Sequence, residues 1–258
     1  MTPARADESY LLSDDITAMI FGVDGVVLDT LRVSAETWRS VLDPFLRSYV
    51  ELHDTVLRPF RVPADYLRYF YGRPRTDGLA DFLASRLITL PFDDLRGLAV
   101  RQEELFLSEA RRLGTPPYQS TVGLVRTARQ RKLATAAVSA ESYAAELLEL
   151  AGAAALFDVR LDATDATGVW RPGDPEQILF LEVARRTTTP PERTAVVESR
   201  MDGVAAAKGG GFGVVIGVDR AGRPDALRER GANAVLSDLS GLRFAGPPPS
   251  DDRPSPSA

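Results

Sequence analysis

The sequence contains no cysteine, which excludes disulfides, thiolate nucleophiles and cysteine metal sites. Its one histidine, His53, is too little for a histidine-based zinc site and is the single candidate for a serine–histidine–aspartate triad. Because His53 lies in a polar stretch without a nucleophile motif, we expect it on the solvated surface of a helix. Lysine is also scarce, since 29 of the 31 basic residues are arginine. Any role that requires a lysine ammonium therefore has two candidates, Lys132 and Lys208.

The chain also lacks the charge of a nucleic-acid binder and the apolar runs of a membrane protein. A net charge of −5 leaves no basic excess to meet phosphates. No run approaches the roughly 18 apolar residues that a spanning helix needs, and the first residues lack the apolar stretch of a signal peptide. We therefore expect a cytoplasmic protein that binds neither nucleic acid nor membranes.

Short apolar runs alternate with amphipathic stretches along most of the 258 residues. The runs predict strands at 18–23, 133–139, 158–162, 194–198, 212–217 and 233–236. Helical periodicity separates them at 120–131, 142–151, 175–186, 202–208 and 226–230. Strands that alternate with helices indicate an α/β fold with a parallel sheet covered on both faces.

A long insertion without a convincing strand follows the first predicted strand. Its amphipathic stretches, near 33–50, 76–86 and 98–112, predict a small helical domain. We therefore expect an α/β core domain at 1–30 and 114–245 and a helical cap domain at 31–113. Ligands of such sheets sit outside the carboxyl ends of the strands, where a cap would act as a lid. The proline-rich end, 246–258, is expected to be a disordered tail.

Polar residues follow several of the predicted strands. The first strand runs into the sequence FGVDG at 21–25, and the second ends at Ser139. The sequence RPGD occupies a loop at 171–174, and the fourth strand ends at Glu198-Ser199. Because the carboxyl ends of parallel strands meet at one edge of a sheet, these residues are predicted to form one site.

This order and spacing resembles the haloacid dehalogenase superfamily, in its β-phosphoglucomutase-like branch with a helical cap, over residues 16–242. The resemblance is carried by FGVDGVVLDT at 21–30, GRPRTDG at 72–78, GLAVRQEELF at 97–106, AAVS at 136–139, RPGD at 171–174 and the run from Val196 to Arg220. It implies a Rossmannoid parallel sheet with an inserted cap, and phosphoryl transfer through an aspartyl-phosphate. A carboxylate that attacks a phosphoryl group needs Mg²⁺ and a fixed cation to offset the charge.

Carried over residue by residue, the resemblance assigns Gly22 to the position of the nucleophile, where glycine has no side chain to phosphorylate. It makes Asp24 the general acid/base and Ser139 the phosphate-binding hydroxyl. Arg171 stands at the position of the phosphate-binding lysine, and the two are not equivalent cations. Backbone amides of the loop at Gly25 would add donors to the phosphate.

The metal-binding acidic pair of the family reads Glu198-Ser199 here, so one of its two carboxylates is absent. Asp24 and Glu198 remain as metal ligands under the resemblance. A hard cation needs several anionic oxygens, so we expect Mg²⁺ binding to be weakened or absent.

The predicted cap keeps some of the family's sugar-phosphate contacts and has lost others. Thr30 at the hinge and Arg75 of the GRPR motif remain as in sugar-phosphate-binding relatives. A histidine usual in the first cap helix is Ser34, and the family's Arg-Lys-Asn triplet reads Arg-Gln-Glu at 101–103. Tyr143 stands where an asparagine often follows the second motif. Together these changes predict a catalytically degenerate member of the family.

Three functions stay open at this stage. The first is a pseudoenzyme that binds a phosphorylated sugar, or acts as a regulatory or interaction protein, with Arg200 in the electrostatic role of the metal. The second is a residual or rearranged Mg²⁺-dependent phosphatase or phosphoglucomutase, in which Asp24 activates water directly or Asp29 or Asp202 supplies a carboxylate. The third is a structural scaffold with an inert cleft. A monomer is the expectation for this capped architecture.

Overall fold

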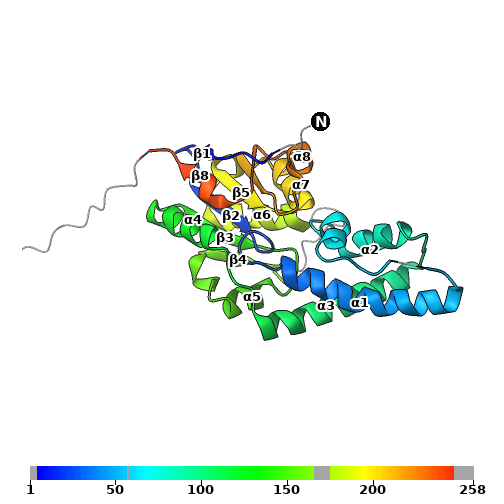
Figure 1. Ribbon diagram of the computed structural model, residues 1–258. Helices are drawn as coiled ribbons and strands as arrows, with labels where there is room; N and C mark the ends of the chain where they lie inside the picture. The colour runs from blue at the N-terminus through cyan, green and yellow to red at the C-terminus, as the bar shows by residue number, and fades with distance from the viewer. Residues whose placement is uncertain (1–4, 57, 166–174, 247–258) are drawn as a thin grey trace, which may run out of the picture.

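A twisted parallel sheet forms the centre of the computed structural model, which describes residues 5–56, 58–165 and 175–246 (Figure 1). Among these residues its strands lie in the order β4-β3-β2-β5-β6-β7, and every neighbouring pair is parallel. They are β2 (Ala18–Gly22), β3 (Ala134–Val138), β4 (Val159–Leu161), β5 (Thr194–Glu198), β6 (Val214–Val218) and β7 (Ala234–Leu236). The predicted α/β fold is confirmed.

Side chains that alternate along each strand bury both faces of the sheet. On β2, Met19 and Phe21 pack into one apolar cluster and Ile20 into the other, as the two-residue period of a strand requires. The first cluster is covered by α4 (Gln119–Gln130) and α5 (Ala144–Leu150). The second is covered by α6 (Pro175–Thr187), α7 (Met201–Gly209) and α8 (Pro224–Glu229). Short 3₁₀ turns are η2 (Ala154–Leu156), η3 (Pro191–Arg193) and η4 (Leu239–Gly241).

A separate two-stranded sheet joins the two ends of the described chain. Strand β1 (Tyr10–Leu12) pairs in parallel with β8 (Leu242–Phe244), and Arg228 of α8 forms an ion pair with Asp7 at 2.9 Å. The sequence pattern predicts no strand in either segment. Each is three residues long, which is too short for its alternation to be recognised.

The inserted segment, residues 31–113, is helical in its regular elements and has an apolar cluster of its own. It contains α1 (Leu31–His53), the π-helical turn η1 (Tyr66–Phe70), α2 (Arg75–Ala84) and α3 (Phe92–Leu113). Figure 1 shows α1, α2 and α3 to one side of the sheet, and their cluster is centred on Trp38, Phe70 and Phe82. His53 is exposed at the end of α1, as expected.

The chain leaves the sheet and returns to it at one place. The amide of Asp29, on the way out, donates to the carbonyl of Pro116 at 3.0 Å, and the amide of Tyr118, on the way back, donates to Val27 at 2.9 Å. These two bonds place the helical segment directly beyond the carboxyl end of β2. None of the described helices combines the length and the apolarity that crossing a bilayer requires. Arg171 and residues 247–258 of the predicted tail lie outside the described residues.

Candidate functional site

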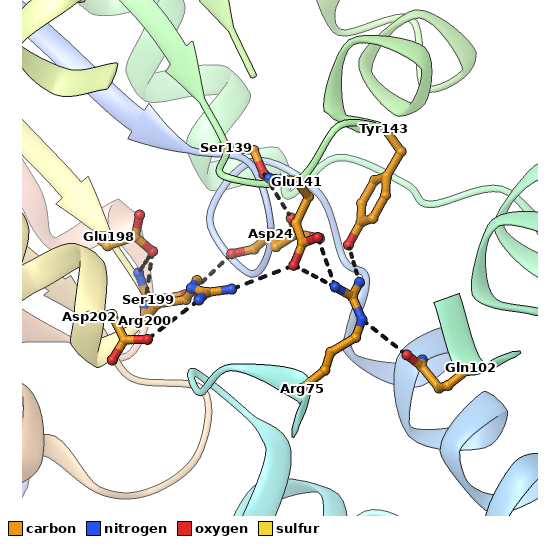
Figure 2. A network of polar contacts seen from close by, with 10 residues as sticks. All are labelled: Asp24, Arg75, Gln102, Ser139, Glu141, Tyr143, Glu198, Ser199, Arg200 and Asp202. Atoms are coloured by element: carbon orange, nitrogen blue, oxygen red, sulfur yellow. Dashed lines mark hydrogen bonds and ion pairs between the residues drawn. The ribbon is translucent and has the colours of Figure 1, made fainter. Parts of the chain in front are cut away.

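The strand register brings three of the predicted site residues together. Gly22 at the end of β2 is paired with Val138, and Phe21 with Val197, so the loops after β2, β3 and β5 begin at one level of the sheet. Asp24, Ser139 and Glu198 therefore meet at one edge (Figure 2). The hydroxyl of Ser139 donates to Oδ2 of Asp24 at 3.5 Å.

The Asp24 carboxyl is held in a largely buried position. Burial raises its pKa above the ordinary value and the charge of Glu141 raises it further, while a hydrogen bond from Thr30 and the cations Arg200 and Arg75 oppose the shift. A carboxyl with a raised pKa keeps its proton more readily than an exposed one. Such a group can act as a general acid or base toward a ligand in the cleft.

The side chain of Glu198 fills a notch between two glycines. A Cβ added to Gly22 would lie 2.5 Å from Oε2 of Glu198, and one added to Gly203 would lie 2.6 Å from its Cγ. The Oε1 atom of Glu198 accepts hydrogen bonds from the backbone amides of Ser199 at 2.7 Å and of Arg200 at 2.9 Å. The carboxylate is thus turned toward the end of β2, into the space that a larger residue at position 22 would need.

The described residues do not fit a Mg²⁺ ion. The hydroxyl of Ser199 donates to the backbone carbonyl of Asp24 at 2.8 Å, and one oxygen of Glu198 already accepts two amides. Asp29 accepts the hydroxyl of Tyr118 at 3.1 Å, and Asp202 pairs with Arg200 at 3.5 Å. In the described part of the chain no three acidic or histidine side chains converge as a hard cation requires.

Arg75, the first residue of α2, reaches across from the helical segment to the loop after β3. Its Nη1 donates to both carboxylate oxygens of Glu141 at 2.8 Å, and its Nη2 donates to the hydroxyl of Tyr143 at 3.0 Å. Its Nε donates to Gln102 at 3.2 Å, and the amide of Gln102 donates to Thr37 at 3.0 Å. Figure 2 shows the contacts of the Arg75 guanidinium group with Glu141, Tyr143 and Gln102.

Gln102 and Tyr143 both support Arg75, since each accepts a hydrogen bond from its guanidinium group. Gln102 is fully buried, and the ring of Tyr143 packs against Phe106 with centroids 5.2 Å apart. Thr37, Gln102, Arg75 and Tyr143 therefore form one connected group of contacts.

Glu141 is the site residue that the sequence reading missed. Besides Arg75 it faces Arg200, whose Nη1 lies 3.9 Å from Oε1. Its own backbone amide donates to the hydroxyl of Ser139 at 3.1 Å. The available signal was its place in the sequence, an acidic residue two positions after Ser139 in a loop that follows a strand.

A small cavity of about 60 Å³ lies between this edge of the sheet and the helical segment. Asp24, Gly25, Thr30 and Arg75 line it, so these predicted residues share one space. Its apolar walls are aromatic side chains, namely Trp38, Tyr66, Phe70, Tyr71 and Tyr143. Ser139 and Glu198 line a smaller hollow on the other side of Asp24.

Comparison with known proteins agrees with this arrangement. A family model for haloacid dehalogenase-like hydrolases matches residues 16–211. A β-phosphoglucomutase from Mycobacterium bovis is 29% identical over 243 residues, which cover 90% of this chain and 93% of that protein. A crystal structure from Rhodobacter sphaeroides, in complex with xylulose 1,5-bisphosphate, has a TM-score of 0.63 at 19% identity and covers 89% of this chain and 97% of that one.

A trehalose-phosphate phosphatase from Mycobacterium bovis is 42% identical over a shorter stretch of 98 residues, 34% of this chain and 24% of that protein.

The family match spans most of the chain, and the parallel sheet agrees with it. The chain belongs to the haloacid dehalogenase-like hydrolase family. Within that family it is similar to the β-phosphoglucomutases.

Proposed function

We propose that the protein binds a phosphorylated sugar between the sheet and residues 31–113, which act as a cap, and that it does not transfer the phosphoryl group through an aspartyl-phosphate. The similarity to β-phosphoglucomutase and the sugar bisphosphate bound to a structural neighbour support the ligand class. The aromatic walls of the cavity, with Arg75 at its edge, suit a sugar ring that carries an anionic group.

The contact between Gly22 and Glu198 is the observation that carries the second half of the proposal. A nucleophilic side chain at the end of β2 would have to enter space that the Glu198 carboxylate fills. Glycine has no side-chain carboxylate that could form the acyl phosphate of an aspartyl-phosphate mechanism. The protein therefore keeps the cleft of the family without its covalent step.

Arginine replaces the metal in this proposal. Arg75 and Arg200 both line the cavity, and guanidinium groups bind phosphate through paired N–H donors without an ion between them. The hydroxyl of Ser139 supplies a further donor next to Asp24. Ligand binding is accordingly expected to be independent of Mg²⁺.

Calorimetric titration of glucose 1-phosphate, glucose 6-phosphate and trehalose 6-phosphate, with and without Mg²⁺, tests the proposal. At least one sugar phosphate is expected to bind equally well under both conditions. An Arg75→Met variant is expected to bind it at least tenfold more weakly. The matched control is Arg111→Met, which removes an exposed arginine paired with Glu146, and its affinity should equal that of the wild type.

Hydrolysis of an aryl phosphate by the same preparation separates the alternatives. Mg²⁺-dependent turnover by the wild type would overturn the proposal in favour of a rearranged phosphatase. If the wild type neither binds a sugar phosphate in the titrations nor hydrolyses the aryl phosphate, the proposal is overturned in favour of a scaffold.

A further inference from the structure

Each of the three guanidinium nitrogens of Arg75 already has a hydrogen-bond partner in the protein. Nη1 donates to the carboxylate of Glu141 and Nη2 to the hydroxyl of Tyr143. Nε donates to the amide oxygen of Gln102. Burial by itself lowers the pKa of Arg75, but the charges of Glu141, Tyr143 and Glu103, together with the hydrogen bond to Glu141, outweigh burial and raise the pKa above its ordinary value. Both oxygens of Glu141 accept charge-assisted hydrogen bonds from Nη1 of Arg75, the kind of bond that arginine also makes to a ligand's carboxylate or phosphate.

Glu141 also lies between two cations rather than beside one. Its Oε1 is 2.8 Å from Nη1 of Arg75 and 3.9 Å from Nη1 of Arg200. Both arginines line the cavity, and so does Glu141 itself. The Glu141 carboxylate thus places a negative group of the chain between the two guanidinium groups (Figure 2).

The cavity leaves no room for a ligand beside this carboxylate. Its volume is about 60 Å³, whereas sites for small molecules generally enclose several hundred cubic ångströms. Two polar contacts join the walls of the cavity. Arg75 joins α2 to the loop after β3 through Glu141, and Arg223 of the sheet side donates to the carbonyl of Leu67 in η1 at 2.6 Å.

We propose that the Glu141 carboxylate acts as an internal ligand of Arg75. An incoming anion must displace this carboxylate from Arg75 before the anion can bind in the cleft. This inference rests on the proposed function for the identity of the anion, a sugar phosphate. Displacement exchanges one anion for another at Arg75 and breaks the Arg75–Glu141 contact between the helical segment and the sheet. Glu141 thus lowers the affinity for anions and couples their binding to the opening of this contact.

Titration of inorganic phosphate and of glucose 6-phosphate into the wild type and a Glu141→Gln variant tests the proposal. Glutamine keeps the shape and an oxygen acceptor for Arg75 but removes the charge, so the variant is expected to bind both anions at least tenfold more tightly. Glu146→Gln is the matched control, because Glu146 forms an exposed bidentate pair with Arg111, and its affinities should equal those of the wild type. Near-ultraviolet circular dichroism confirms that each variant is folded, and Glu141→Ala serves as a second variant.

Anion affinity in Glu141→Gln and Glu141→Ala that equals or falls below that of the wild type would overturn the inference. Binding by both wild type and variants with equal affinity would leave the proposed function standing and remove the role of Glu141. Binding by the variants alone would support the role of Glu141 and argue against sugar-phosphate binding by the wild type. Failure of all forms to bind any anion would overturn both.

Discussion

Glu198 and Gly22 share one notch at the end of β2, in which the Glu198 carboxylate lies 2.5 Å from where a Cβ of residue 22 would begin. A contact of that length is shorter than real Cβ atoms make, so any side chain at position 22 must move Glu198. Glu198 is itself held by two backbone amides. The identity of residue 22 and the orientation of residue 198 are therefore linked.

We expect Gly22→Ala to lower the free energy of unfolding by about 1–3 kcal/mol, the usual cost of an overpacked buried site. In a Glu198→Ala background the notch is open, so the same change is expected to cost less. Urea denaturation of the four proteins measures this coupling. Gly97→Ala is the control, since a Cβ at Gly97 meets no atom within 4 Å. Equal costs of Gly22→Ala in the two backgrounds would contradict the shared notch.

Asp65 gives a pH-dependent prediction in the helical segment. Its side chain is 2% exposed and accepts hydrogen bonds from Arg61 and Arg86. Burial raises its pKa, but the hydrogen bonds from Arg61 and the charge of Arg86 outweigh this and leave the pKa below its ordinary value. An acid whose pKa is lowered in the folded state stabilises the fold above the pKa of the unfolded state, and this stabilisation is lost as the pH falls.

Asp65→Asn is therefore expected to lower the free energy of unfolding by about 2 kcal/mol at neutral pH. The gap to the wild type should narrow as the pH falls below about 4. Thermal melts of the wild type and of Asp65→Asn, from neutral pH down to below about pH 4, measure this difference in stability. Glu146→Gln removes an exposed ion pair and should stay within about 0.5 kcal/mol of the wild type at neutral pH. A gap for Asp65→Asn that is constant with pH would rule out the ionic explanation.

Gln102 is expected to be a positioning residue for Arg75. Gln102→Leu has nearly the same shape but leaves Nε of Arg75 and the hydroxyl of Thr37 without their partner in a fully buried place. We expect a loss of about 1–3 kcal/mol in unfolding free energy. Sugar-phosphate affinity should fall as well, and Gln102→Glu, which keeps an acceptor for Arg75, should retain more of it. A Gln102→Leu protein with lower stability and unchanged affinity would show a purely structural role.

Arg223 provides a test of how the helical segment is held to the sheet. Arg223→Ala removes the hydrogen bond to the carbonyl of Leu67, so this side of the cleft should open more often. Hydrogen exchange is expected to accelerate in η1, at residues 66–70, with little change in β2 and β5. Arg228→Ala is a matched control, because Arg228 contacts the first residues of the chain, away from η1. Unchanged exchange in η1 would contradict the prediction.

The sheet could be predicted from the sequence because its strands are short buried runs whose ends carry the polar residues. That logic placed Asp24, Ser139 and Glu198 at one edge, which the register confirms. Helix starts were less well placed. Helix α3 begins at Phe92, six residues before the predicted stretch, although Pro91 and the acidic residues 93 and 94 are ordinary signals of a helix start.

The orientation of side chains could not be read from spacing. Nothing in the linear sequence shows that Glu198 turns toward Gly22, since that depends on Gly203 of a following helix leaving space. The pairing of Arg75 with Glu141 joins residues 66 positions apart across two parts of the fold. Glu141 can be recognised as a site residue only when the helical segment, with Arg75, is packed against the sheet.

The strand order has a consequence for how the protein is made. Strand β2 is synthesised first among the strands of the large sheet, yet it lies at the centre, with β3 and β5 as its neighbours. Its partner residues in β3 and β5 begin at Ala134 and Thr194, so a fully apolar strand leaves the ribosome long before either neighbour exists. During translation the nascent chain therefore carries an unpaired hydrophobic segment, which chaperones recognise and which makes incomplete chains prone to aggregation.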